Sequence, residues 1–165
     1  MSNASDIANT KVKDLIDAIG GKRIAPGAGA AGAVTLALAA ACTAKAVAIS
    51  LKHQPDQAVL RRSQVILEAM ARFALAGADR DAETFAAFIK EHTSGAIAEV
   101  IREGDRIGRL ITVLSDVIEK IAPHIAANMT GDLVAARALA DAARKIQATN
   151  SSEARDEKRQ LDSKT

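Results

Sequence analysis

Aromatic residues are scarce in this chain of 165 residues, which has no Trp, no Tyr and three Phe. Proteins that read nucleic acids commonly stack bases on aromatic side chains or carry a recognisable base-reading motif, and this sequence has neither. The 22 Lys and Arg residues are nearly balanced by 20 Asp and Glu residues, so the charge leaves no basic surface of the kind that binds nucleic acid. We therefore expect no nucleic-acid partner.

Cysteine and histidine are also scarce. Cys42 is the single cysteine, which excludes a disulfide framework, and the first residues lack the charged and apolar regions of a secretory signal. We expect a cytoplasmic protein in which Cys42 packs as a small apolar residue. His53, His92 and His124 stand singly, without the spacing of a metal site, so we expect no metal. His53 is a candidate general base because it lies just past a predicted helix end.

The chain lacks a long, strongly hydrophobic run. Its most apolar uncharged stretch, residues 28–44, consists largely of Ala and Gly. A membrane-spanning helix needs about 20 predominantly apolar residues, and Ala gains far less than Leu or Ile on leaving water. We therefore expect no membrane partner and a buried helix instead. Its small side chains allow close approach of neighbouring backbones, which predicts a central position.

Helical periodicity dominates what is present. Apolar residues recur at the spacing of one helix face, and no segment shows strand alternation. Gly77 predicts a kink or a break between two collinear or bent helices, and Gly104 predicts a break. The predicted helices cover residues 6–19, 30–51, 55–76, 78–92, 95–102, 105–121 and 130–150. We predict an all-α protein, a helical bundle built around the Ala-rich helix within a single domain of residues 1–150. Residues 151–165 are almost wholly polar, which predicts a frayed or disordered tail.

A Gly-rich turn precedes the Ala-rich helix. Pro26 fixes one φ angle, and Gly27 and Gly29 can adopt positive φ. Unpaired backbone N–H groups at a helix N-terminus can hold an anion such as a carboxylate. The alternative is a tight turn that serves only close helix packing, and the turn by itself leaves both interpretations open.

Three segments together resemble the C-terminal domain of the formiminotransferase-cyclodeaminase family, which includes methenyltetrahydrofolate cyclohydrolases. Residues 25–33 (APGAGAAGA) are similar to its P-G-G-G-S-V-A-A segment, and residues 81–85 (DAETF) to its D-x-x-A-F helix. Residues 131–136 (GDLVAA) resemble its S-D-x-x-V-A-A helix, which ends near an Asn, here Asn150. In order and spacing the resemblance covers about residues 10–150.

The resemblance implies an all-helical homodimer that binds a tetrahydrofolate derivative and acts as a cyclohydrolase or a cyclodeaminase. The reaction that the resemblance implies needs no metal or organic cofactor, since the substrate itself carries the electrophilic carbon. Asp132 and Asp81 are the candidate catalytic acids or bases, with Asp132 expected to face the Gly-rich turn. The candidate substrate-binding residues are Pro26, Gly27, Gly29, Lys45 and Lys52, the two lysines being placed to meet a glutamate tail.

Each candidate has an alternative without function. Asp132 can be a charge at a helix N-terminus, Asp81 one half of a surface ion pair, and the lysines can extend from a packed helix into water. Ala28 stands where the family motif has glycine, and Ala30 and Gly131 stand where it has serine. These replacements favour a second hypothesis, a diverged, non-catalytic helical dimer that is a folate-binding or protein-interaction module. Convergence of Asp81, Asp132 and the turn on one cleft would favour the enzyme.

Overall fold

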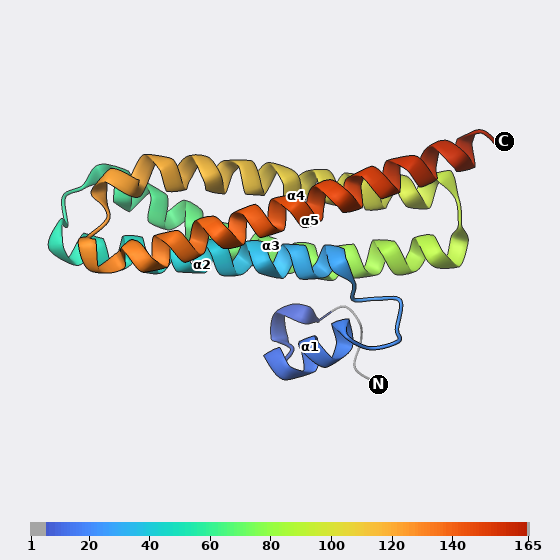
Figure 1. Cartoon of the computed structure of the whole chain (residues 1–165), viewed down its shortest axis with the longest axis horizontal. Coiled ribbons are helices and arrows are strands. Elements are labelled where there is room, and N and C mark those ends of the chain that lie inside the picture. Colours follow the sequence, from blue (N-terminus) through green and yellow to red (C-terminus); the bar gives the residue numbers. More distant parts are fainter. Residues whose placement is uncertain (1–5, 165) are drawn as a thin grey trace.

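A computed structural model describes residues 6–164, and within them the chain is helical without a strand. The expected all-α class is confirmed. Residues 1–5, where the expected domain begins, and residue 165, where the expected tail ends, lie outside the described residues. Four long helices run side by side as a bundle, and a short N-terminal helix lies against one flank (Figure 1). Their bounds are α1 Val12–Ile19, α2 Ala28–His53, α3 Ala58–Glu91, α4 Ser94–Ile121 and α5 Thr130–Asp162.

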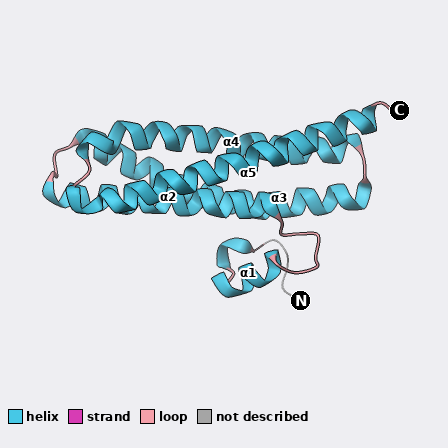
Figure 2. Ribbon diagram, viewed as in Figure 1, coloured by secondary structure: helices cyan, strands magenta, loops and turns pink. Residues whose placement is uncertain are grey.

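Short turns complete the path of the chain (Figure 2). Single 3-10 turns occupy Ile7–Asn9 before α1, and Ala122–His124 and Ala127–Met129 between α4 and α5. The first of these is joined to the bundle by the Ile7 backbone N–H, which donates to Asp79 Oδ1 on α3 at 2.5 Å. The continuous helix expected over residues 6–19 is therefore divided in two.

The central position predicted for the Ala-rich helix is confirmed, because α2 packs against both α3 and α5. Its buried face consists mostly of Ala, with Leu36 and Val47 as the largest apolar members. Two buried hydroxyls on α2 are satisfied within the helix: Thr43 donates to the Ala39 carbonyl and Ser50 to the Ala46 carbonyl. By length and composition α2 is the one helix within residues 6–164 that could cross a membrane, and the core helix of a helical bundle meets the same criteria.

The breaks expected at Gly77 and Gly104 are wrong, because α3 and α4 continue through them. A Cβ at Gly77 would lie 2.5 Å from Ile107 Cδ1, and a Cβ at Gly104 would lie 2.5 Å from Gln147 Nε2. Each glycine therefore permits close contact between two helices. That gain outweighs the roughly 1 kcal/mol by which Gly disfavours a helix relative to Ala.

The expectation of a frayed or disordered tail is also wrong for residues 151–162, which continue α5 as regular helix. Ala154 is buried in a small apolar cluster with Phe88, Ala96 and Ile97, separate from the main core. At the end of the helix, Ser94 Oγ donates to Asp162 Oδ1 at 2.5 Å. These contacts position the last three turns of α5 against α3 and α4, beside the site described next.

Candidate active site

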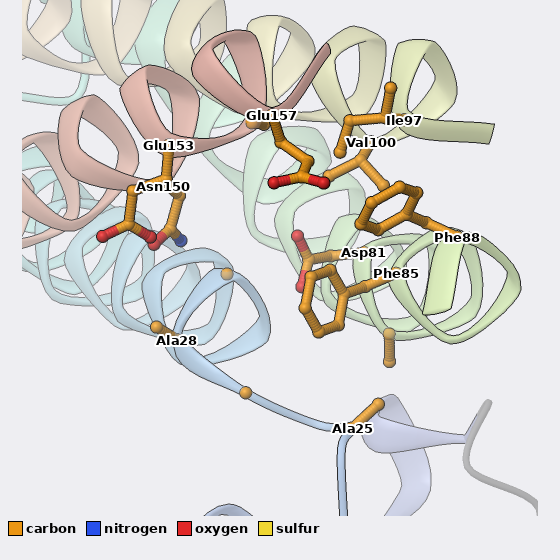
Figure 3. Close-up of a pocket in the computed structure, with 14 residues that line it drawn as sticks. Ala25, Ala28, Asp81, Phe85, Phe88, Ile97, Val100, Asn150, Glu153 and Glu157 are labelled. Atoms are coloured by element: carbon orange, nitrogen blue, oxygen red, sulfur yellow. The ribbon is translucent and has the colours of Figure 1, made fainter. Parts of the chain in front are cut away.

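A cavity of about 330 Å³ opens where α2 begins, between α3, α4 and the C-terminal half of α5 (Figure 3). The turn before α2 forms one edge, and apolar side chains of α3 and α4 form the opposite wall. Its lining residues are Ala25, Gly27, Ala28, Gly29, Asp81, Ala82, Phe85, Phe88, Ile97, Val100, Asn150, Glu153, Ala154 and Glu157.

Asp81 lies against the first turn of α2. A Cβ built on Gly29 would lie 2.1 Å from Asp81 Oδ1 and 2.4 Å from Oδ2, distances that no real Cβ adopts. Position 29 must therefore be glycine for the carboxyl to occupy this place. Gly29 is helical, and no glycine within residues 6–164 has positive φ, so the expected positive φ is wrong while the expected close approach is present.

The surroundings of Asp81 hold its proton unusually tightly. Burial is the main cause that raises the pKa of Asp81 from 3.8 to about 6, and the negative charge of Glu103 acts in the same direction as the smallest of three effects. A hydrogen bond from the Ala30 backbone N–H opposes them and is the smaller effect compared with burial. A carboxyl with a pKa near 6 can both give and take a proton near neutral pH, which is the requirement for general acid–base catalysis.

The remaining cavity wall divides into an apolar side and a polar side. The rings of Phe85 and Phe88 lie on the apolar side, with centroids 6.4 Å apart. Asn150, Glu153 and Glu157 project from α5 on the polar side (Figure 3). The charged residues that line the cavity are thus all acidic. Beside the cavity, His92 Nε2 lies 3.9 Å from Glu157 Oε1.

Comparison with known proteins decides the family. The model of the formiminotransferase-cyclodeaminase family matches residues 11–153. The chain belongs to this family. A solved structure with a similar fold is the formiminotetrahydrofolate cyclodeaminase from Thermotoga maritima, with a TM-score of 0.87 and 21% identity, covering 92% of this chain and 81% of that one. A comparison with curated proteins finds no match.

This member of the formiminotransferase-cyclodeaminase family brings three of the predicted site residues together. Asp81, Gly27 and Gly29 all line the cavity. Pro26 is buried next to Gly27 and instead lines a separate hollow against α1. The Gly-rich turn and the Asp81 helix, two of the three segments on which the resemblance was based, thus converge on one cleft.

Asp132 and the two lysines lie elsewhere. Asp132 begins α5 and pairs through Oδ1 with Lys45 Nζ at 2.8 Å, and this ion pair is largely exposed. Lys45 is 15 residues beyond Ala30 on α2, or about 22 Å along the helix. Lys52 lies a further two turns along, near the C-terminus of α2. The expectation that Asp132 faces the Gly-rich turn is therefore wrong, and the roles of the lysines stay predictions.

The three histidines are dispersed over the fold. His53 ends α2, His92 ends α3 in the left-handed region at φ 49°, and His124 Nδ1 lies 3.0 Å from Gln57 Nε2. Within the described part of the chain, no three His, Cys, Asp or Glu side chains gather as possible metal ligands. Cys42 is free and partly buried on α2.

Sequence reasoning missed the part of the site that α5 and the apolar wall supply. Phe85 and Asn150 belong to the quoted motif segments, so their order along the chain was an available signal. Glu153 and Glu157 fall in the polar segment interpreted as a tail, and their spacing of four residues on one helix face was the signal there.

Proposed function

We propose that this chain is a one-carbon folate enzyme, a methenyltetrahydrofolate cyclohydrolase or a formiminotetrahydrofolate cyclodeaminase, with its active site in the cavity at the start of α2. The observation that carries the proposal is Asp81, a largely buried carboxyl with a pKa of about 6 at the wall of an apolar cavity. Its occurrence in a chain of the formiminotransferase-cyclodeaminase family supports a folate derivative as the ligand.

The two sides of the cavity match the two parts of such a ligand. The flat pterin ring packs against Phe85 and Phe88, and the Asn150 amide, which both donates and accepts hydrogen bonds, pairs with the polar ring edge. A one-carbon unit bound as a cationic amidine is favoured beside the acidic side chains Asp81 and Glu157. No Lys or Arg lines the cavity, so the anionic glutamate tail extends out of it toward solvent.

In the cyclohydrolase reaction, Asp81 is the base. A water molecule adds to the methenyl carbon of the cationic ring, and the ionised Asp81 carboxylate takes a proton from that water as the new C–O bond forms. One C–N bond of the ring then breaks as the Asp81 carboxyl gives the proton it took to the departing nitrogen, and the hydroxyl proton leaves to solvent as the formyl C=O forms on the other nitrogen. The net reaction consumes water and releases one proton, which leaves Asp81 ionised for the next turnover.

In the cyclodeaminase reaction, Asp81 is the acid. The free folate amine nitrogen outside the pterin ring attacks the cationic formimino carbon, and a new C–N bond forms. The protonated Asp81 carboxyl delivers its proton to the departing nitrogen, so that ammonia leaves as its C–N bond breaks, and the proton of the attacking nitrogen passes back to the Asp81 carboxylate. The methenyl cation that remains is the substrate of the first reaction. A pKa of about 6 populates both forms of the carboxyl near neutral pH, so one residue supports either direction of proton transfer.

Turnover of the two candidate substrates by matched aspartate variants tests the proposal. The wild-type chain should convert methenyltetrahydrofolate or formiminotetrahydrofolate faster than buffer alone. Asp81→Asn should reduce the rate at least about a hundredfold, the size expected for loss of a positioned acid or base. Asp132→Asn, which removes the same group from the exposed pair with Lys45, should retain most of the activity. Equal loss in both variants, with circular dichroism unchanged, would contradict the assignment of Asp81.

A second candidate function is folate binding without catalysis. Ala30 and Gly131 lack the hydroxyls that the family motif has at those positions, and Ala30 directly follows Gly29 at the cavity edge. The same experiment separates the two functions. Saturable binding of a reduced folate, with no turnover of either substrate above the buffer reaction, would establish the binding module in place of the enzyme.

A further inference from the structure

Glu103 is a buried charge in the interior of the bundle. It lies on α4 with 3% of its surface exposed. Taking a carboxylate out of water costs several kcal/mol, and apolar residues of similar size often replace buried ion pairs without loss of stability. Its presence so deep in an apolar helix interface is therefore better explained by a role in the neighbouring site than by stability.

Two arginines fix the position of the Glu103 carboxylate. Arg106 Nη1 donates a hydrogen bond to Glu103 Oε2 at 3.0 Å, and Arg80 Nε forms an ion pair with Oε1, also at 3.0 Å. The second contact lacks the geometry of a hydrogen bond, and neither Arg80 Nε nor Glu103 Oε1 has another hydrogen-bond partner. Oε1 is therefore held by the charge of Arg80 alone and accepts no hydrogen bond.

This carboxylate lies over the same face of α3 that carries Asp81. A Cβ on Gly77 would lie 3.4 Å from Glu103 Oε1, so the glycine is what lets Glu103 approach α3. Gly77 and Asp81 are four residues apart and are neighbours on one helix face. Glu103 is thus about one helical turn from the proposed acid–base residue and does not line the cavity.

The charges around Asp81 come from three helices. Arg80 precedes it on α3, and Glu103 with Arg106 approaches from α4. Glu153 and Glu157 line the cavity from α5. The cavity-lining residues of α2 carry no charge, and α2 supplies the Ala30 N–H hydrogen bond. The charge of Glu103 raises the pKa of Asp81, and this effect is smaller than burial, which also raises it, and than the Ala30 N–H hydrogen bond, which lowers it.

We propose that Glu103 is a positioning residue for Asp81, a buried negative charge held one helical turn away by Arg80 and Arg106 that favours the protonated form of the Asp81 carboxyl. The inference rests on the proposed function, since it assigns Glu103 a part in the acid–base step. It adds a residue of α4 that touches neither the cavity nor the ligand and that no motif in the sequence marked.

Direct titration of Asp81 tests this role without any folate. The Asp81 carboxyl carbon is followed by NMR from pH 3 to pH 9 in the wild type and in E103Q. Replacement of Glu103 by the neutral amide should lower the Asp81 midpoint by about half a pH unit or more, because a nearby like charge is removed while Arg80 and Arg106 remain. E99Q is the matched control, since it removes the same charge from an exposed carboxylate on α4 that pairs with Arg102 at 2.8 Å.

An unchanged midpoint in folded E103Q, or an equal change in E99Q, would overturn the inference. If E103Q does not fold, R106Q tests the same charge effect, with a shift of the Asp81 midpoint in the opposite direction. It removes a half-exposed positive charge from the Glu103 pair and should raise the Asp81 midpoint, whereas R102Q should not. E103D, which keeps the charge, should have the same Asp81 midpoint as the wild type. A different Asp81 midpoint in E103D would assign Glu103 a purely steric role.

The pH dependence of turnover then connects the titration to the reaction. In E103Q the pH at which the rate falls on the acid or base side should move by the same amount as the Asp81 midpoint. If the wild type turns over folate but the Asp81 midpoint is unchanged in E103Q, this inference alone is contradicted. If the wild type shows no turnover but the Asp81 midpoint does shift in E103Q, the proposed function is contradicted. Glu103 is then a residue that only changes the pKa of the Asp81 carboxyl.

Discussion

At the scale of single residues, the missing side chain of Gly29 determines where the Asp81 carboxyl can lie. In an ordinary helix, Gly→Ala stabilises by roughly 1 kcal/mol. Gly29→Ala should instead push the Asp81 carboxyl away from α2, since its Cβ would lie 2.1 Å from Oδ1. We expect folate turnover to fall at least about tenfold while the helical circular dichroism is retained.

The matched control for Gly29 is Gly108, a helical glycine on α4 with nothing within 4 Å of its built Cβ. Gly108→Ala should leave turnover unchanged and raise the melting temperature. If Gly29→Ala also raised the melting temperature and retained full turnover, Asp81 would not depend on the absence of this side chain.

The pKa of Asp81 also has a consequence for stability. Because the folded-state pKa of about 6 lies above the unfolded value of 3.8, the folded chain binds the proton more tightly, and this contribution is present below pH 4 and lost as the pH rises through 6. Asp81→Asn removes the ionisation. The variant and the wild type should unfold with similar free energy at pH 4, and at pH 8 the variant should be more stable by up to about 3 kcal/mol. Urea denaturation at both pH values measures this, and a difference that does not change with pH would contradict the raised pKa.

At the scale of elements, periodicity predicted the existence of every long helix, and the bounds of the Ala-rich helix differ from those of α2 by two residues at each end. It failed where a local rule was overruled by contacts between distant residues. Gly77 and Gly104 resemble breaks locally, yet they fit under Ile107 and Gln147 of neighbouring helices. Likewise, the polar composition of residues 151–162 does not indicate the few apolar contacts that hold the end of α5 against the bundle. Ala154 is the buried residue among those that make them.

The docking of this part of α5 should depend on Ala154. Ala154→Asp places a charge against Phe88 and Ile97, and we expect it to cost at least about 2 kcal/mol, lowering the melting temperature by about 5 °C or more. It should also weaken folate binding, since Asn150, Glu153 and Glu157 are on the same turns. Ala142→Asp on the exposed face of α5 is the control and should change neither property. Equal effects of the two substitutions would mean that these turns do not pack as described.

At the scale of the whole molecule, the sequence predicted part of the site and misplaced the rest. The Gly-rich turn and Asp81 could be paired because each matched a segment of one family. The position of Asp132 could not be inferred, because a helix N-terminus in the sequence does not show at which end of an antiparallel bundle it lies. Here α2 and α5 run in opposite directions, which separates the start of α5 from the start of α2 (Figure 1).

A homodimer stays a prediction, and the exposed apolar residues indicate one surface for it. Leu38 on α2 and Phe73 on α3 are 53% and 59% exposed, and each lies 15 or 16 residues from the turn that joins the two helices, so the two are at a similar level of the α2–α3 hairpin. Light scattering at micromolar concentration should give twice the mass of 17.2 kDa. Phe73→Glu should shift the mass toward the monomer, whereas Val113→Glu on α4 should not. A monomeric wild type would exclude the dimer.

A bound reduced folate should lie in the cavity at the start of α2, and a crystal structure of the complex shows whether it does. A crystal structure of the chain with a saturating, stable reduced folate should place the pterin ring against Phe85 and Phe88, with a ring or one-carbon nitrogen within hydrogen-bonding distance of the Asp81 carboxyl. A ring bound at the Lys45–Asp132 pair, or anywhere else away from the start of α2, would contradict the account.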